Sequence, residues 1–264
     1  MQSERKLFFP VRDIVDEFIH YQKSLQKLDV ISIVGEGEPT LYSGLGELID
    51  KIKEISDVPV AVITNSSLLA DSAVQNALLN ADIVLPSMDA YDEKTFRKIN
   101  RPHFSVKYED TQKGLIEFSH KYKGQLWLEI MLLAGMNDDD ASLGKFAAML
   151  PKIKYDRVYI NTPVRPPAES FAEPPSKEQI QKAVEKLSAI SIDMLSTGNF
   201  FSDVSDHYEA IKNICQRHPM NSFELETFLS SRDVADIETY KKRLEEDPEI
   251  NCIKYKGITS YRLK

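Results

Sequence analysis

The stretch Val30-Ile31-Ser32-Ile33-Val34-Gly35-Glu36-Gly37-Glu38-Pro39-Thr40-Leu41 joins a short β-branched run to a loop of glycine, acid and proline. The run predicts a buried strand, because valine and isoleucine favour strands. The two glycines would let the backbone approach a ligand, and the proline stiffens the loop. The loop is therefore either a ligand site or an ordinary turn between a strand and a helix. As a ligand site it would contribute Gly35, Glu36, Gly37, Glu38 and Pro39.

Outward from this stretch, apolar runs alternate with amphipathic segments up to about residue 200. The further runs are 60–63, 82–85, 126–132, 158–160 and 190–195. Apolar residues recur at helical spacing in 11–25, 45–55, 74–79, 112–122, 143–150 and 177–187. The alternation predicts an α/β fold with a parallel sheet, either a complete or partial barrel or an open doubly wound sheet. In each arrangement, a site is expected at the carboxyl ends of the strands.

The pattern changes after about residue 204, which predicts two domains, 1–203 and 204–264. Helices are expected over 206–216, 222–229 and 237–244, followed by strands over 250–255 and 258–263 that flank a Lys-Gly turn. Three short helices and a hairpin resemble a winged-helix domain. Its third helix, with Lys241, Lys242 and Arg243, would contact nucleic acid. From residue 206 onward, however, ten Lys or Arg stand against eleven Asp or Glu, so protein contact is an equal alternative.

Composition narrows the class of protein. The net charge of −8 over 264 residues argues against nonspecific binding of nucleic acid. The chain has no signal-peptide-like start and no apolar run long enough to span a membrane, which predicts a cytoplasmic protein without a membrane partner. Cys215 and Cys252 are its only cysteines, so no disulfide framework is expected. Their apolar neighbours predict buried structural thiols.

Six segments, taken in order, resemble motifs of the radical S-adenosylmethionine (SAM) superfamily. The 35–41 loop resembles the GGEP-type motif that contacts the amino group of SAM. Residues 63–67, Ile-Thr-Asn-Ser-Ser, are similar to the TNG element at the next strand end, with Ser66 where glycine is usual. Residues 85–90 resemble the strand end that faces the SAM ribose or carboxylate. The others are 96–103 (the INRPH stretch of one subgroup), 129–137 (the strand and loop near the adenine) and 161–167 (the NTPVRPP segment).

This resemblance covers roughly residues 7–175 and implies a partial TIM-like barrel of radical SAM type, with SAM as cofactor. By position, it assigns SAM binding to Gly35, Glu36, Gly37, Glu38, Pro39, Asn65, Ser66, Ser87, Asp89 and Glu129. It assigns contact with an unidentified substrate to His103, Asn161 and Arg165.

One part of the family pattern is missing. Radical SAM proteins bind a [4Fe–4S] cluster through the three thiolates of a CxxxCxxC loop after their first strand, and the fourth iron position accepts SAM. In the matching subgroup a string like Arg5-Lys6-Leu7-Phe8-Phe9-Pro10 follows that loop, and here it opens the chain. The expectation is that the first strand and cysteine loop are missing from the front of this chain, either by truncation or because the protein truly lacks them. The cluster would bind only if they are present, and this chain as given is expected to hold no metal and not to cleave SAM.

Three hypotheses follow. The first is a radical SAM enzyme in which a 5′-deoxyadenosyl radical acts on an unknown substrate. The second is a non-catalytic protein on the same scaffold, which binds SAM or a partner through the winged-helix-like module. The third is a metal-free aldolase-type barrel, which requires a reactive lysine at a strand end, and none is evident.

For several single residues, more than one role is open. Glu38 either holds the SAM ammonium or is a solvated loop acid, and Asp89 either bonds a ribose hydroxyl or caps the helix that begins near Asp92. Glu129 alternates with apolar neighbours, so it is expected to face a barrel interior. Arg165 would clamp an anionic substrate or form a structural ion pair, and His103 would carry a proton or be a satisfied loop histidine. Trp127 is expected in the core.

Overall fold

The computed structural model describes residues 4–22, 28–35, 37–163, 169, 171–192, 200–255 and 258–264. Two of the sequence-predicted site residues, Glu36 and Arg165, lie outside the described residues. The chain divides into two compact units, one of Met1–Thr162 with Pro174–Ile192 and one of Pro163–Glu173 with Asp193–Lys264. In the part of the chain that the structure describes, no helix is long and apolar enough to cross a membrane.

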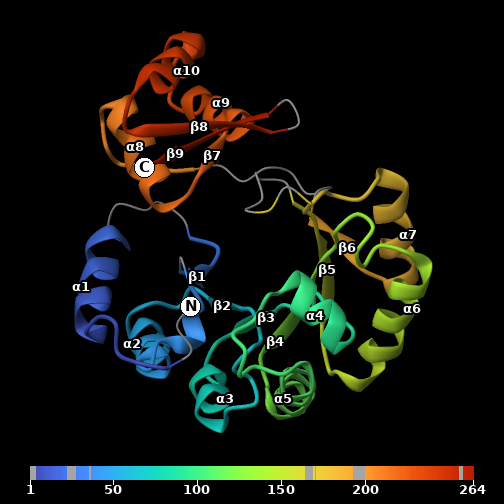
Figure 1. Ribbon diagram of the computed structural model, residues 1–264. Helices are drawn as coiled ribbons and strands as arrows, with labels where there is room; N and C mark the ends of the chain where they lie inside the picture. Colours follow the sequence, from blue (N-terminus) through green and yellow to red (C-terminus); the bar gives the residue numbers. More distant parts are fainter. Residues whose placement is uncertain are drawn as a thin grey trace. The chain divides into compact units, whose positions relative to one another are not determined.

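The first unit is an α/β fold built on a six-stranded parallel sheet (Figure 1). Its strands are β1 (Ile31–Ile33), β2 (Val60–Thr64), β3 (Ile83–Pro86), β4 (Gln125–Met131), β5 (Arg157–Asn161) and β6 (Ile190–Ser191). They lie side by side in chain order, and each pair of neighbours is parallel. The sheet curves as part of a TIM-like barrel does, so all its carboxyl ends open on one edge.

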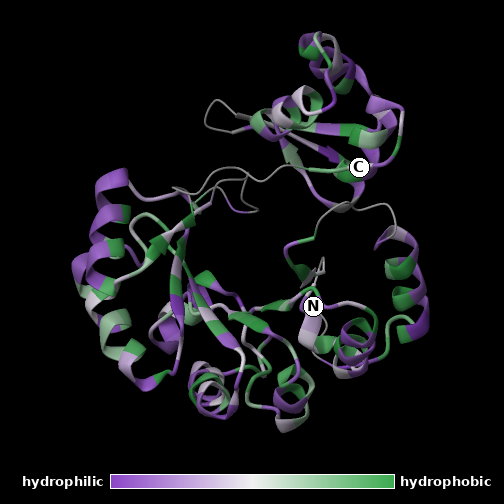
Figure 2. Cartoon of the chain, turned by 180° about the vertical axis from the view of Figure 1, so that it is seen from behind, coloured by the Kyte–Doolittle hydropathy of each residue, from purple (hydrophilic) through white to green (hydrophobic). Residues whose placement is uncertain are grey.

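Helices connect the strands and cover the outer face of the sheet (Figure 1). They are α1 (Val11–Gln22), α2 (Leu45–Ile55), α3 (Ser72–Leu78), α4 (Glu93–Ile99), α5 (Tyr108–Lys121), α6 (Asp140–Met149) and α7 (Lys177–Leu187), with short 3-10 turns η1 (Pro39–Leu41) and η2 (Leu150–Lys152). Side-chain caps from Asp71, Asp92, Asp139 and Ser176 satisfy amides that the first turns leave unpaired. The outer sides of these helices are largely hydrophilic (Figure 2).

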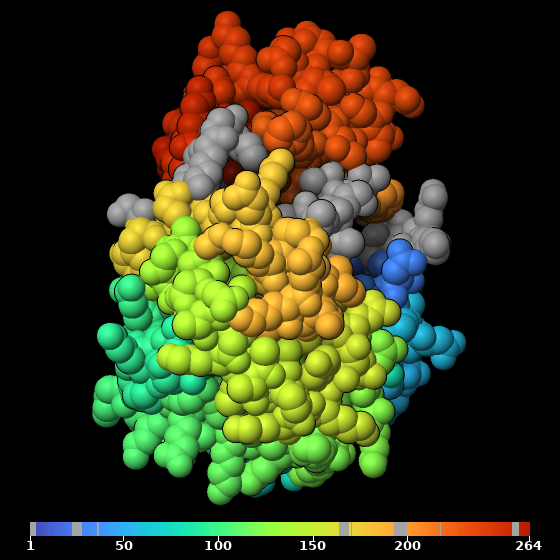
Figure 3. Space-filling model, turned by 90° about the vertical axis from the view of Figure 1, so that its right-hand side faces the viewer, coloured from blue at the N-terminus to red at the C-terminus, as the bar shows by residue number. Residues whose placement is uncertain are grey.

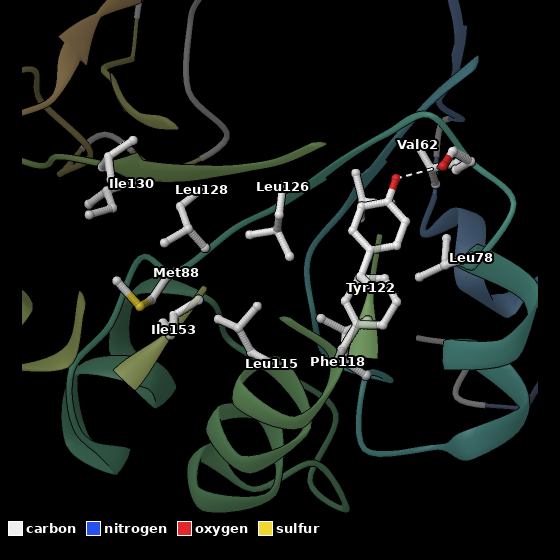
Figure 4. Close-up of a cluster of buried hydrophobic side chains, with 14 of the residues drawn as sticks. Val62, Leu78, Met88, Leu115, Phe118, Tyr122, Leu126, Leu128, Ile130 and Ile153 are labelled. Carbon is white, nitrogen blue, oxygen red and sulfur yellow. Dashed lines mark hydrogen bonds between the residues drawn. The ribbon is translucent and has the colours of Figure 1, made fainter. Parts of the chain in front are cut away.

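The main core lies between the outer face of the sheet and the helices. On β4, Leu126, Leu128 and Ile130 are fully buried and point toward α5 (Figure 4). The phenolic hydroxyl of Tyr122 donates a hydrogen bond to the carbonyl of Ala81 at 2.7 Å, which satisfies the one polar atom of this buried ring. The alternation along β4 then directs its remaining side chains to the inner face of the sheet.

Trp127 is one of these inward side chains, and its predicted place in the core is wrong. The ring is half-buried, and the guanidinium carbon of Arg157 lies 4.6 Å from the ring centroid. Its indole nitrogen donates to Gln125 at 3.1 Å. The cause is the period of two: in a strand whose even-numbered residues face the helices, an odd-numbered tryptophan faces the barrel interior.

Two glycines on helices differ sharply in their surroundings. A Cβ on Gly114 of α5 would lie 2.3 Å from the backbone nitrogen of Ala70 and 2.4 Å from the carbonyl carbon of Leu69. A Cβ on Gly144 of α6 would meet only the amino group of Lys186, at 3.9 Å. Gly114 therefore permits a backbone-to-backbone contact, whereas Gly144 lies on the open side of its helix. Figure 3 looks onto the α6–α7 face, where Lys186 binds Asp140 at 2.6 Å.

The second unit contains α8 (His207–Arg217), β7 (Met220–Asn221), α9 (Ser222–Ser230), α10 (Ile237–Glu246), β8 (Ile250–Tyr255) and β9 (Ile258–Leu263). Its antiparallel sheet has the order β7-β9-β8, so the predicted hairpin is joined by a short strand that the sequence analysis missed. Tyr208, Ile211, Phe228 and Tyr261 are among its buried core residues.

The cations predicted for nucleic-acid contact take part in contacts within this unit. Lys241 donates to Glu226 at 2.7 Å and to Glu238 at 2.6 Å, and the Arg243 guanidinium lies 3.6 Å from the centroid of the Tyr208 ring. Ion pairing of this kind reduces the positive potential that phosphate binding needs. Contact with nucleic acid or with a protein through this unit stays a prediction.

Candidate functional site

The Glu38 carboxylate ties the loop after β1 to the end of β2. Its Oε1 accepts hydrogen bonds from the backbone nitrogen and hydroxyl of Thr40, at 3.1 and 2.7 Å, and from the hydroxyl of Thr64, at 2.6 Å. Its Oε2 accepts from the backbone nitrogen of Asn65 at 2.7 Å. A carboxylate has room for about four hydrogen bonds. Glu38 thus holds the loop in place, and direct contact with the SAM ammonium stays a prediction.

The neighbouring loop residues have different roles. Pro39 is the first residue of η1, so its fixed φ starts the turn that Glu38 caps. A Cβ added to Gly37 would meet no protein atom within 4 Å, and neither Gly35 nor Gly37 has a positive φ. Packing therefore does not require glycine at position 37. Its bare backbone leaves open space that a ligand can fill.

Ser66 acts through its backbone shape. Its φ of 66° is left-handed, a region that favours glycine, which accounts for the glycine usual at this position in the family. The side chain is fully buried and its hydroxyl donates to the carbonyl of Ser87 at 2.7 Å, so it links the ends of β2 and β3. Asn65, just before it, is exposed and its side-chain oxygen accepts from the backbone nitrogen of Ser67 at 3.0 Å.

Asp89, after β3, connects three loops. Its carboxylate accepts hydrogen bonds from the backbone nitrogen of Met131 at 2.9 Å and from the side-chain amide of Asn100 at 2.8 Å. Its backbone carbonyl accepts from the amide of Asn137 at 3.0 Å. Burial raises the pKa of Asp89 to about 6, helped by the nearby Glu129 carboxylate and opposed by the Met131 and Asn100 hydrogen bonds. This residue fixes the segment that follows α4.

The alternative role for Asp89, as a helix cap, is wrong. Asp92 caps α4, because its carboxylate accepts from the backbone nitrogen of Thr95 at 2.8 Å. Asp89 lies three residues before this capping position, and its carboxylate instead accepts a hydrogen bond from the backbone nitrogen of Met131, at the end of β4.

Glu129 lies on the inner face of β4, as predicted. It is half-buried, and its carboxylate accepts a hydrogen bond of 3.3 Å from the side-chain amide of Asn161, at the end of β5. Burial raises its pKa above the ordinary value, and the Asn161 hydrogen bond partly opposes this. Ser87 forms a parallel bridge with Glu129, so the ends of β3, β4 and β5 present Ser87, Glu129 and Asn161 together.

A cavity of about 360 Å³ opens beside this edge, between the 35–41 loop and the segment that follows α4. Its lining includes Gly37, Glu38 and Asn65 together with Asn100, Arg101 and His103. Asn100 Oδ1 is buried and has no hydrogen-bond partner. The volume falls within the range of small-molecule sites, roughly 300–1,000 Å³. The structure therefore brings predicted cofactor residues and the predicted substrate residue His103 around one cavity.

A second cavity, of about 560 Å³, runs along β1. Among the described strands, β1 pairs only with β2, so one of its edges is free. Its lining is mostly apolar and comes from α1, β1 and α2, and it includes Ile14, Phe18, Ile31, Ile33, Leu45 and Leu48. Gly35, Gly37 and Glu38 also line this cavity. Gly37, Glu38 and Leu41 thus line both cavities.

Ligands for an iron–sulfur cluster are missing. Within the described ranges, no three His, Cys, Asp or Glu residues are grouped so that they could hold a metal ion. Both cysteines of the chain belong to the second unit. Cys215 is buried, which raises its pKa to about 11, and the half-buried Cys252 thiol donates to the carbonyl of Leu244 at 3.5 Å. Two packed thiols cannot supply three thiolates, so a [4Fe–4S] cluster does not fit this chain.

Similarity to known proteins agrees with the fold. The sequence profile of the radical SAM superfamily matches residues 2–147. The chain belongs to the radical SAM superfamily. The UPF0026 protein of Methanocaldococcus jannaschii is 33% identical over 267 residues, which cover 98% of this chain and 82% of that protein. A UPF0026 protein of Helicobacter pylori strain J99 is 34% identical over 217 residues, 80% of this chain and 69% of its own length.

A solved structure shares the fold. The radical SAM methyltransferase from Sphaerobacter thermophilus superposes with a TM-score of 0.51 at 19% identity, over 69% of this chain and 55% of that protein. At this identity the likeness concerns the fold alone.

Sequence reasoning missed several residues that shape the site. Thr40 and Thr64 hold Glu38, and Asn100 and Asn137 hold Asp89. All four lie inside or next to motifs that the sequence analysis quoted, so the motifs were the available signal. Their partners lie up to 48 positions away along the chain, and no local pattern shows such pairs.

A substitution at Asp89 tests the effect of burying its carboxyl. The folded-state pKa of about 6 lies above the unfolded value, so its proton is bound more tightly in the folded chain. The resulting stabilisation is complete below pH ~4 and is lost as the pH rises through about 6. Asp89→Asn stays neutral, but its amide nitrogen would face the donor of Met131 or Asn100, a cost that is the same at both pH values. We therefore expect the stability of Asp89→Asn relative to wild type to be higher at pH 8 than at pH 4, by up to about 3 kcal/mol.

Urea unfolding at the two pH values measures this difference. Asp110→Asn, at an exposed position on α5, is the control and should show no such pH-dependent gain. A stability difference from wild type that is the same at pH 4 and pH 8 would contradict the raised pKa.

Proposed function

We propose that this chain binds SAM at the carboxyl edge of its parallel sheet. The observation that carries the proposal is the convergence of polar groups from four consecutive strands. The clamped loop after β1, Asn65 after β2, Ser87 after β3 and Glu129 on β4 all belong to this edge. Open sheets and barrels bind their ligands at this end of the strands.

The residues present fit SAM. Its ammonium and sulfonium groups are cationic and its ribose has two hydroxyls, which match the carboxylate and amide oxygens of Glu129 and Asn161. The open backbone at Gly37 provides a close approach without a side chain in the way. When bound, SAM supplies a 5′-deoxyadenosyl group. The chain's own residues would bind, orient and shield it.

We further propose that the chain by itself binds SAM without cleaving it. Reductive cleavage needs a cluster whose three thiolates this sequence does not contain. Thiolates from outside these 264 residues would be required for radical chemistry on a substrate.

Calorimetric titration tests the binding site. We expect SAM to bind more tightly than S-adenosylhomocysteine, whose sulfur is uncharged, because Glu129 favours a cation. Glu129→Gln should weaken SAM binding by roughly tenfold and S-adenosylhomocysteine binding by less. Glu117→Gln, on the exposed face of α5, should leave both unchanged. Absence of SAM binding to the folded wild-type chain would overturn the proposal.

Incubation with iron, sulfide and a reductant under anaerobic conditions tests the second part. The expected result is no 5′-deoxyadenosine in chromatography of the mixture. Formation of 5′-deoxyadenosine by the chain alone would show that a cluster is held by groups other than three cysteines.

A further inference from the structure

β1 lies at one end of the six-stranded sheet and, among the described strands, pairs only with β2 (Figure 1). We propose that a second copy of this chain pairs with the free edge of β1, so that the two β1 strands run antiparallel across a two-fold axis at Ser32. The inference concerns the assembly of the protein and is independent of the proposed SAM site.

The backbone polar groups of Ser32 point away from β2. In the parallel pair, Ile31 lies opposite Val60, and its N–H donates to the carbonyl of Pro59 at 2.8 Å. The N–H and C=O groups of successive residues in a strand point to opposite edges, so those of Ser32 point to the free edge. Ser32 is also an exposed residue, so its donor and its acceptor are open to an incoming strand.

The sequence around Ser32 reads the same in both directions, Val30-Ile31-Ser32-Ile33-Val34. A two-fold axis places one residue opposite a second, and the second opposite the first. With the axis at Ser32, this residue lies opposite Ser32 of the second copy, and the two central residues exchange both of their N–H···O bonds. Ile31 then lies opposite Ile33, and Val30 opposite Val34. The symmetry of the sequence therefore matches a second copy of the same strand.

This edge lacks the features that prevent edge strands from pairing. Natural edge strands carry lysine, other charges or proline for this purpose, and residues 30–34 contain none of these. Four of the five residues are valine or isoleucine, which favour strand pairing. Such an edge is expected to have a partner, and no further strand in the described part of the first unit provides one.

Exposed apolar side chains lie beside the same edge. Val34 is 56% exposed and Phe9 is 65% exposed, and both line the 560 Å³ cavity along β1. Ile31 and Ile33 also line this cavity, together with Phe18 of α1, and all three are only half-buried. The core between β1 and α1 is therefore incompletely covered. A second β1 strand would bring apolar side chains to this surface, and the central parts of homodimer interfaces are typically apolar.

Sedimentation velocity of the 264-residue chain measures its assembly. We expect a dimer at micromolar concentration, with twice the chain mass of 30.1 kDa. Ser32→Pro removes the N–H at the free edge and leaves the bonds to β2 in place, so it should weaken the dimer at least tenfold. Ser32→Thr keeps this N–H and is the matched control. Val34→Lys adds a charge to the edge and should also give monomers. Unchanged far-UV circular dichroism shows that the variants are folded.

Cysteine cross-linking tests the antiparallel register. Residues opposite each other in a hydrogen-bonded antiparallel pair have Cα atoms about 5.5 Å apart, which suits a disulfide. Ser32→Cys should therefore form covalent dimers on mild oxidation. Val34→Cys should not cross-link with itself, but it should cross-link with Val30→Cys. The wild-type chain is the control, since its Cys215 is buried and its Cys252 is half-buried in the second unit.

Two results would overturn the inference. A wild-type chain that stays monomeric at these concentrations would mean that the edge of β1 is closed by something other than a second copy. A dimer that survives Ser32→Pro and gives no Ser32→Cys cross-link would place the contact between copies on another surface.

Discussion

Replacement of Glu38 with alanine is expected to weaken SAM binding by at least an order of magnitude and to destabilise the chain by about 3 kcal/mol. The substitution removes all four hydrogen bonds of the carboxylate and leaves the buried hydroxyls of Thr40 and Thr64 without their partner. Buried hydroxyls without partners are costly. The loop would then no longer be tied to the end of β2, so its backbone would not be preorganised for the ligand.

Glu38→Gln separates the two effects. The amide oxygen can still accept from Thr40 and Thr64, but the amide nitrogen would face the N–H of Asn65. We expect a loss of affinity between those of wild type and Glu38→Ala. Calorimetric SAM titration and urea unfolding measure the two quantities, and Glu47→Gln, exposed on α2, is the control. Unchanged affinity in Glu38→Ala would show that the loop keeps its shape without the clamp.

The substitution Gly114→Ala, which adds one methyl group, is expected to destabilise the first unit strongly. Its Cβ would lie 2.3 Å from the Ala70 nitrogen, a backbone atom that cannot rotate away as a side chain can. Relief requires α5 to move off the segment after β2, which would also disturb the core around Leu115 and Phe118. Overpacking in cores costs about 1–3 kcal/mol. Because the added Cβ would clash with backbone atoms, which cannot move independently, Gly114→Ala should cost more than about 3 kcal/mol.

Gly144→Ala is the matched control on a helix. Its Cβ meets only the flexible end of Lys186, and alanine favours a helix interior over glycine. We expect this variant to gain about 0.5–1 kcal/mol in the free energy of unfolding. Thermal melts of the two variants measure the contrast. Gly114→Ala with a wild-type melting temperature would mean that α5 packs less closely against Leu69 and Ala70 than described.

The regular elements could be read from the sequence because each has its own periodicity. Helices were predicted to within a few residues at 45–55 and 177–187, where apolar residues recur at helical spacing. The predicted strands follow from β-branched runs that are buried against helices on one face. The prediction that Trp127 lies in the core was wrong. Composition indicates an apolar strand, but only the register of β4 determines which of its side chains face the helices and which face the barrel interior.

The site was predictable in outline and not in detail. Polar residues directly after strands were predicted to lie together, because parallel strands end on one edge, and Ser87, Glu129 and Asn161 do so. The partners of Glu38 could not be read from the sequence, since its carboxylate accepts hydrogen bonds from Thr64 and Asn65 at the end of β2, more than 25 positions away. Ser66 is a second example. The sequence showed only that serine stands where glycine is usual, and the structure supplies the reason for that glycine, a left-handed backbone with a φ of 66°.

The chain-order arrangement of β1 to β6 has a consequence for local unfolding. Every strand pairs with its sequence neighbour, so no pairing requires closure of a loop longer than a few tens of residues, and the sheet can form stepwise. Among the described strands the two end strands, β1 with three residues and β6 with two, each pair on one side only, so in the monomer their amides should exchange with solvent soonest. Of the two, β1 leads directly into the 35–41 loop. A ligand bound at this loop should therefore slow exchange in Ile31–Ile33 and leave exchange in β6 unchanged, so that binding would stabilise one end of the sheet and not the other.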